Sequence, residues 1–376
     1  MHEPKPRVLF VSRERHRLPL EGAQRRKWEA LGAELDVRVL GAAPAGWPTR
    51  DGRFDLVSPV RPRFLDGALF YFLLPIRILR ELRAFRPEVA IVQGVHETCA
   101  FLLGRWFAGV PTKVVLDVQG DWHESTRLYG SSLRRLLNPL SDAMAPLAVR
   151  GANAVKTVST QTTELVRGHG VEPAAVFPAY VDAKTFLEQP PAPLSDQPGS
   201  VFVGVLERYK ALDTLVQAWR LAVARLHDGT LHVVGDGTMR PDVERLVAEL
   251  PEHTRWSPRL DAEGVAAAMD AAWCVCLPSR SEGLPRVGLE AMCRGRALIG
   301  GDRAGIPDLV RDGENGLLID PDDAGALADA LVWILSDRSR AERLGAAARR
   351  SAEEWGITPE RHAERFSALV RDTLAK

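Results

Sequence analysis

The sequence predicts an α/β protein in which two consecutive domains each contain a doubly wound parallel sheet. The chain has 376 residues, which fits two domains of about 100 to 200 residues each. Short runs rich in Val, Ile and Leu alternate with helical stretches along most of its length, which is typical of strand–helix–strand units. The segment 188–199 contains four prolines and cannot continue a strand or a helix, so it marks the domain boundary.

The expected strands are nearly continuous apolar runs, which indicates sheets buried on both faces. In the first domain they are residues 7–12, 36–40, 89–94, 112–120 and 152–159. In the second domain they are residues 200–206, 230–237, 254–259, 272–280, 296–301 and 316–320. The pattern from about residue 322 onward is helical only. We therefore expect domains at 1–188 and 200–355, a linker at 189–199, and a C-terminal helix at 356–376 that packs back on the first domain.

The composition excludes several classes of function. Lys and Arg together number 49, as do Asp and Glu, so the net charge gives no case for a nucleic-acid partner. The four cysteines form no CxxC pair and no cluster with histidine, which favours reduced core thiols over a metal site. No apolar run of signal-peptide length precedes the first strand. We expect a cytoplasmic protein without a metal ion.

One segment could associate with a membrane surface. Residues 69–79, LFYFLLPIRIL, are mostly apolar, but they are too few to span a bilayer, which takes about 20 residues. Arginines follow in the continuation to residue 86. A basic amphipathic helix at a membrane surface fits this pattern, and so does a helix packed on a sheet with its arginines in solvent.

Two loops that follow strands of the second domain carry signals for a ligand. In GVLERYKALD, Gly204 ends a strand, and Arg208 and Lys210 stand at the entrance of a helix. Two cations there suit a diphosphate, which also gains from the free amides of a first helical turn, although solvated surface charges would look the same. The second loop, in VVGDGTMR, contains Gly235, Asp236 and Gly237. It lacks the third glycine of a dinucleotide fingerprint, so it predicts either a close approach of backbone amides to a ligand or an ordinary turn.

The stretch SRSEGLPRVGLEAM contains two glutamates on either side of a helix start. Pro285 suits the first helical turn, so the amides around Gly283 and Leu284 should be unpaired and attract an anion. Glu282 and Glu290 would then flank that anion and accept hydrogen bonds from hydroxyl groups. An acidic helix start followed by a surface glutamate is the alternative.

Taken together, these segments resemble the family-4 retaining glycosyltransferases of group 1 type, which have the GT-B fold of two Rossmann-like domains. The resemblance extends over nearly all of residues 172–335 and rests on FPAYVDAKTF, GVLERYKALDTLVQAW, VVGDGTMRPDVERLV, PSRSEGLPRVGLEAM and GGDRAGIPDLVRDGENGLLIDPDD. It implies that the second domain binds a nucleotide sugar and the first binds the acceptor. It also implies that Glu282 holds hydroxyls of the donor sugar, Glu290 holds the ribose diol, and Lys210 neutralises the leaving diphosphate. No metal or other cofactor is expected.

The chain departs from the family pattern at two positions. Val205 stands where members of the family usually have an arginine after the glycine of the phosphate loop, and Arg208 is the residue available to replace that cation. Gln119 stands where many members have a histidine, with Asp121 and His123 just beyond. The first domain offers only Gly22 where a Gly-Gly loop is usual. We place Gln119, Asp121, His123 and Gly22 on the acceptor or sugar side.

The resemblance implies an enzyme that moves a hexose from a UDP- or GDP-sugar to a saccharide or lipid-linked acceptor. Bacterial polysaccharide or glycolipid synthesis at the cytoplasmic face of a membrane is the expected setting. Two alternatives remain open at this point. One is a nucleotide-sugar epimerase of the same fold, and the other is a non-catalytic protein that binds a nucleotide sugar.

Overall fold

A computed structural model describes residues 4–60, 63–123, 132–181, 183–188, 190–355 and 358–376. It divides into two compact units. The described parts of residues 1–123, 132–180 and 359–376 form the first unit, and those of residues 181–358 form the second. Each unit is built on its own sheet, so the predicted α/β class with two parallel-sheet domains is confirmed.

The first unit contains an eight-stranded sheet with the order β3-β4-β2-β1-β5-β6-β7-β8. All neighbouring strands are parallel except β3 and β4. The strands are β1 (Arg7–Arg15), β2 (Asp36–Ala42), β3 (Arg50–Asp51), β4 (Phe54–Val57), β5 (Val89–Gln93), β6 (Lys113–Asp117), β7 (Ala154–Thr157) and β8 (Ala175–Val176). The strands β5, β6 and β7 are almost fully buried, and the central part of β1 is largely buried, as their continuous apolar runs predict.

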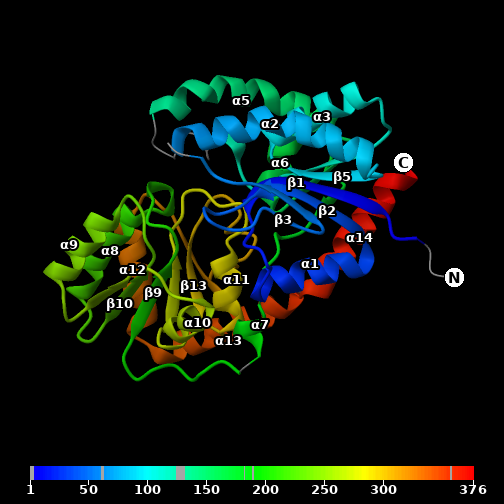
Figure 1. Cartoon of the computed structure of the whole chain (residues 1–376). Helices are drawn as coiled ribbons and strands as arrows, with labels where there is room; N and C mark the ends of the chain where they lie inside the picture. The colour runs from blue at the N-terminus through cyan, green and yellow to red at the C-terminus, as the bar shows by residue number, and fades with distance from the viewer. Residues whose placement is uncertain (1–3, 61–62, 124–131, 182, 189, 356–357) are drawn as a thin grey trace. The chain divides into compact units, whose positions relative to one another are not determined.

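Helices cover both faces of this sheet (Figure 1). On one face lie α2 (Arg63–Ala84), α3 (Val95–Ala108) and α5 (Ser132–Gly151), which pack side by side. On the other face α1 (Gly22–Glu34) packs against α14 (Pro359–Ala375), so the C-terminal helix belongs to the first unit. A short helix, α6 (Thr160–Arg167), follows β7 and is capped by Ser159. The two faces bury separate apolar clusters.

The second unit contains a six-stranded parallel sheet with the order β11-β10-β9-β12-β13-β14. Its strands are β9 (Gly199–Val203), β10 (Thr230–Val234), β11 (Thr254–Ser257), β12 (Cys274–Leu277), β13 (Ala297–Gly301) and β14 (Gly316–Ile319). Its helices are α7 (Lys184–Leu187), α8 (Leu212–Val223), α9 (Arg240–Glu249), α10 (Ala262–Asp270), α11 (Arg286–Cys293), α12 (Ala324–Leu335) and α13 (Arg338–Glu354), with a 3-10 turn, η1, at Arg208–Lys210. Cys274 and Cys276 are free thiols buried in β12.

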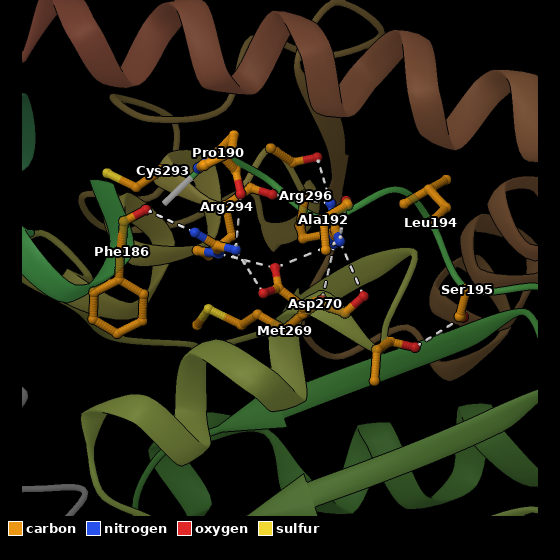
Figure 2. Close-up of polar contacts among 12 residues, drawn as sticks. Phe186, Pro190, Ala192, Leu194, Ser195, Met269, Asp270, Cys293, Arg294 and Arg296 are labelled. Carbon is orange, nitrogen blue, oxygen red and sulfur yellow. Dashed lines mark hydrogen bonds and ion pairs between the residues drawn. The ribbon is translucent and has the colours of Figure 1, made fainter. Parts of the chain in front are cut away.

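The segment expected to be the interdomain linker is hydrogen-bonded to residues of the second unit (Figure 2). Arg294 donates hydrogen bonds to the carbonyls of Phe186 and Pro190, at 3.3 and 3.4 Å, and Arg296 donates to that of Ala192 at 2.9 Å. Both guanidinium groups are buried and share Asp270 as their carboxylate. In this structure residues 181–358 belong to the second compact unit, and these arginines bind backbone carbonyls of the proline-rich segment.

Candidate functional site

Parallel topology brings the three predicted loops of the second unit to one edge of its sheet. The loops follow β9, β10 and β12, which are neighbours in the order β10-β9-β12. Because the strands are parallel, their carboxyl ends meet at the same edge. The loop after β9 contains Lys210, and the loop after β12 contains Glu282. The residues predicted from separate stretches of sequence thus lie together.

Lys210 and Glu282 form an ion pair across this edge. The Lys210 Nζ contacts Glu282 Oε1 directly, and the two side chains are only 13% and 14% exposed. The hydroxyl of Ser279, itself fully buried, donates to the same carboxylate oxygen at 3.1 Å. These contacts use Oε1 and leave Oε2 able to accept a hydrogen bond from a ligand. The two side chains predicted to contact a ligand are thus paired with each other in this structure.

Arg280 holds the loop that presents Lys210, a role that sequence reasoning missed. Its Nη1 donates to the backbone carbonyl of Arg208 at 2.6 Å and to Asp213 at 2.8 Å, and its Nε donates to Asp322 at 2.6 Å. Its own amide donates to the carbonyl of Tyr209 at 2.8 Å. The η1 turn is therefore fixed from two sides by one residue. The only signal in the sequence was a basic residue between β12 and the first glutamate.

The D-x-D pair after β14 belongs to the same network. Arg280 and Arg303 both donate to Asp322, and Arg303 also donates to Asp320. The hydrogen bond from Arg280 is the main reason that the pKa of Asp322 lies below its ordinary value. Both carboxylates are therefore paired with arginines. In the part of the chain that the structure describes, no group of three or more His, Cys, Asp or Glu side chains could hold a metal ion.

Gly235 and Gly237 are required by the close approach of the loops after β9 and β10. Gly235 has φ +144, and a Cβ there would lie 1.8 Å from the carbonyl oxygen of Gly204. A Cβ on Gly237 would lie 2.5 Å from the carbonyl oxygen of Leu206. Asp236 joins the same contact, because its carbonyl accepts from the amide of Leu206 at 3.0 Å. The G-x-G pattern thus packs two site loops together. A Cβ on Gly204 would make only ordinary contact with the stem of Lys210, at 3.7 Å.

The helix start after Glu282 is open, as predicted. Among the described residues, the amides of Gly283 and Leu284 donate to no protein acceptor. Pro285 is the N-cap residue rather than part of the first turn, and its carbonyl accepts from Gly288 and Leu289 instead. No side chain caps this end of α11. The half-buried Glu290 lies on α11 itself, so a helix N-terminus separates the two glutamates.

Val205, which departs from the family pattern on the phosphate loop, and Arg208, the cation available to replace the missing one, are both exposed. Val205 presents its side chain to solvent directly after Gly204. Arg208 is also exposed, and its guanidinium forms no hydrogen bond or ion pair with any residue that the structure describes. The loop thus carries one cation that is paired, Lys210, and one that is available, Arg208.

In the first unit, a buried ion pair orients Gln119 at the end of β6. Lys156 is fully buried, and its Nζ lies 2.9 Å from Asp117 Oδ1. The other oxygen of Asp117 accepts from Gln119 Nε2 at 2.6 Å. Because a carboxylate can only accept, the amide oxygen of Gln119 is turned away from Asp117 and is available as an acceptor.

The remaining residues predicted for the first unit have mainly local partners. His123 Nδ1 lies 2.6 Å from Asp142, and its Nε2 accepts from the indole of Trp122 at 3.1 Å, so both ring nitrogens are used. The carboxylate of Asp121 accepts from the amide of His123 at 2.7 Å. Gly22 begins α1 with φ +50, and a Cβ there would meet nothing within 4 Å.

Comparison with known proteins identifies the family of the chain. A family model described as "Glycosyl transferases group 1" matches residues 184–351, and one described as "Glycosyl transferase 4-like domain" matches residues 22–179. D-inositol 3-phosphate glycosyltransferase of Nocardia farcinica is 34% identical over 185 residues, which are 46% of this chain and 41% of that protein. Alpha-D-kanosaminyltransferase of Streptomyces kanamyceticus is 27% identical over 320 residues, or 78% of each chain.

Solved structures agree on the fold. Sucrose-phosphate synthase from Thermosynechococcus elongatus superposes with a TM-score of 0.75 at 21% identity, over 99% of this chain and 100% of that one. HepE of Anabaena, in complex with UDP and glucose, superposes with a TM-score of 0.68 at 16% identity, over 96% of this chain and 100% of that one. The two family models lie on the two structural units and together account for most of the chain. The protein belongs to the group 1 glycosyltransferases of the GT-B fold.

Proposed function

We propose that this glycosyltransferase moves a hexose from a nucleotide diphosphate sugar, with UDP or GDP as the nucleotide, to a saccharide or lipid-linked acceptor. The observation that carries the proposal is the junction of Lys210, Glu282 and the open start of α11 at one edge of the second sheet. A cation, a carboxylate and free amides within one site match a ligand that has both hydroxyls and a diphosphate. Because the chain belongs to a family of transferases, we do not propose the two alternatives, epimerisation of the donor and donor binding without transfer.

Each part of the donor has a residue that suits it. The free oxygen of Glu282 accepts from hydroxyls of the sugar, and Glu290 accepts from the ribose diol. The amides of Gly283 and Leu284 donate to the phosphate and sugar oxygens. Gly204, Gly235, Asp236 and Gly237 shape the backbone wall of the same site, because their loops pack directly on one another.

The chemistry we propose is substitution at the anomeric carbon with retention of configuration. The bond from that carbon to the diphosphate oxygen breaks, and the acceptor oxygen bonds to the carbon on the same face. The proton of the acceptor hydroxyl passes to the departing phosphate oxygen, so the nucleoside diphosphate leaves and no protein nucleophile is needed. Lys210 and the exposed Arg208 stabilise the negative charge that develops on the phosphate. Since these cations and a helix N-terminus supply positive charge, we propose that the reaction needs no metal ion.

The cation missing at Val205 is replaced, in this proposal, by Arg208. Both residues lie on the exposed loop that follows β9, and the guanidinium of Arg208 is long enough to reach a phosphate bound beside Lys210. Arg280 donates to the carbonyl of Arg208 at 2.6 Å, and this contact fixes the backbone from which the Arg208 side chain extends. Loss of Arg208 should therefore weaken donor binding, and Val205→Arg in the same protein should restore part of it.

The acceptor side is assigned to the first unit. Gln119, oriented by Asp117, presents an amide oxygen to a hydroxyl, whereas a histidine could also carry a charge. Asp121, His123 and Gly22 complete the proposed acceptor side. Among the similar proteins, one is described as a sulfoquinovosyl transferase of Arabidopsis thaliana and others as GDP-mannose-dependent phosphatidylinositol monomannoside mannosyltransferases. These descriptions support a nucleotide-sugar donor, and we propose polysaccharide or glycolipid synthesis at the cytoplasmic face of a membrane.

Incubation with radiolabelled UDP- and GDP-hexoses and a membrane extract tests the proposal. We expect label to move to a saccharide or lipid fraction, and proton NMR of the product should show the anomeric configuration of the donor. Lys210→Met is the matched inactive control. Conversion of the donor sugar to an epimer, or donor binding without any transfer, would contradict the proposal.

A further inference from the structure

A buried ion pair lies in the core of the first unit, at the carboxyl end of β6. Lys156 of β7 and Asp117 of β6 are partners in register on neighbouring parallel strands. The side chain of Lys156 is fully buried, that of Asp117 is 8% exposed, and Lys156 Nζ lies 2.9 Å from Asp117 Oδ1. The Nζ makes no directed hydrogen bond with any residue that the structure describes, so the carboxylate of Asp117 is its electrostatic partner.

The other close neighbours of the Lys156 ammonium group are aromatic rings. The Nζ lies 4.6 Å from the ring centroid of Phe177 and 5.8 Å from that of Phe366 on α14. Both rings are buried and pack edge to face, with 5.0 Å between their centroids. A ring face attracts a cation without replacing the hydrogen bonds that water would supply. Two rings and one carboxylate therefore hold this lysine in one position.

The pair does not serve stability in any evident way. Phe177 and Phe366 belong to a large apolar cluster, in which hydrophobic side chains would pack without loss. Replacement of a buried ion pair by hydrophobic residues of similar volume is often neutral or stabilising, because both charges must be taken out of water. A role outside the core therefore explains the pair better than a role within it.

The polar group that lies next to the pair is the amide of Gln119. Asp117 Oδ2 accepts from Gln119 Nε2 at 2.6 Å, and the intervening Val118 is fixed because its amide donates to the carbonyl of Lys156 at 2.8 Å. A carboxylate beside a lysine accepts hydrogen bonds only, so the amide nitrogen of Gln119 must face it and the amide oxygen must point away. Gln119 is partly exposed just after β6, at the edge where open α/β sheets bind ligands.

We propose that the Lys156–Asp117 pair positions Gln119 for the transfer, with the amide oxygen of Gln119 held ready to accept a hydrogen bond from a sugar hydroxyl. Lys156 fixes Asp117, and Asp117 fixes both the rotamer of Gln119 and the end of its amide that faces the ligand. A glutamine without such a partner must lose its side-chain freedom when the ligand binds. Lys156 and Asp117 are positioning residues, because they act through Gln119. The inference rests on the proposed function, and the hydroxyl belongs to the donor sugar or to the acceptor.

The double variant Asp117→Leu/Lys156→Met tests the inference. Leucine has the branched shape of aspartate and methionine has the unbranched length of lysine, so the core stays filled and no charge is left unpaired. We expect a melting temperature close to that of the wild type and a fall in kcat/KM of about tenfold, because the ligand must now order Gln119. In a Gln119→Met background the same double change should cause no further fall. The matched control is Arg38→Met/Glu81→Gln, which removes another ion pair of the first unit and should keep wild-type kinetics.

Substrates in which fluorine replaces one hydroxyl identify the source of the contacted hydroxyl. Fluorine cannot donate a hydrogen bond to an amide oxygen, so the analogue fluorinated at that position should be a poor substrate of the wild type. The double variant should discriminate less against it, because the amide of Gln119 is then free to turn. If this loss of discrimination appears with a fluorinated donor, the hydroxyl belongs to the donor sugar, and if it appears with a fluorinated acceptor, the hydroxyl belongs to the acceptor.

Three results would overturn the inference. One is a kcat/KM of the double variant equal to that of the wild type. Another is an equal fall with and without Gln119, which would show that the pair acts through the fold rather than through this amide. The third is unchanged discrimination against every fluorinated donor and acceptor. If instead the wild type transfers no sugar from any nucleotide sugar, the proposed function fails and this inference fails with it, whereas the three results above leave the proposed function intact.

Discussion

Replacement of Lys210 by methionine tests the centre of the proposed donor site. The change keeps most of the apolar stem and removes the charge that contacts Glu282. Both side chains are about seven-eighths buried, so the remaining carboxylate loses its cation in a poorly hydrated position. Breaking a fully buried pair costs about 3–5 kcal/mol and an exposed pair contributes about 0–1 kcal/mol. With Ser279 still donating to Glu282 at 3.1 Å, we expect the free energy of unfolding to fall by about 2 kcal/mol.

The effect on transfer should be separate from the effect on stability. A preorganised charge that stabilises the transition state is worth about 100- to 1,000-fold in kcat, so Lys210→Met should lower turnover by that factor while the protein remains folded. The double variant Lys210→Met/Glu282→Gln removes both charges, and it should recover about 1 kcal/mol or more of the lost stability without recovering turnover. Urea unfolding and a coupled assay of nucleoside diphosphate release measure the two quantities. Turnover of Lys210→Met near that of the wild type would refute the reasoning.

Three further predictions concern residues that support the site and the first unit. A lysine at position 280 cannot bind the carbonyl of Arg208 and the carboxylates that Arg280 contacts at the same time, so Arg280→Lys should lower kcat about tenfold or more. Its melting temperature should change less. A kcat equal to that of the wild type would contradict this role. Gly235→Ala would place a Cβ 1.8 Å from the carbonyl of Gly204, and it should lower the free energy of unfolding by at least about 2 kcal/mol, measured in urea. Burial lowers the pKa of His362 to about 2. As the pH falls below 6.5, this histidine takes up a proton in the unfolded state but not in the folded state. The free energy of unfolding should therefore decrease by up to about 1.4 kcal/mol for each pH unit of acidification. His362→Phe should flatten the dependence of the urea midpoint on pH between 6 and 4, and an unchanged slope would show that another group titrates.

The fold was predictable because long apolar runs are strong signals. The central strands β1, β5, β9, β10, β12 and β13 lie within or close to the expected ranges, since strands buried on both faces need continuous Val, Ile and Leu. The strands β3 and β8 have two residues each, which is too few to show a pattern of apolar residues that predicts a strand. The Pro75 that interrupts an apolar run does not end α2, because the surrounding side chains pack on the sheet and outweigh local propensity.

The site was predictable as a set of loops but not as a set of contacts. Parallel strands bring loops together wherever they lie in the sequence, which is why Lys210 and Glu282 could be assigned to one site. Their direct pairing depends on loop conformation, as does the path of Arg280 across the η1 turn. The contacts of the proline-rich segment could not be predicted for a similar reason. Its composition predicts a linker, and nothing in it reveals that distant arginines bind its carbonyls.

The most direct test of the account is a thermal-shift titration with UDP-, GDP- and ADP-sugars. A ligand present at about 100 times its Kd stabilises the folded state by about 2.7 kcal/mol, which corresponds to a rise in Tm of about 7 °C for a unit of this size. We predict such a rise for at least one UDP- or GDP-sugar. The shift should shrink in Glu290→Ala and remain in Leu221→Ser, which lies on the outer side of α8. If no nucleotide sugar raises Tm, or if Glu290→Ala retains the full shift, the proposed donor site is wrong.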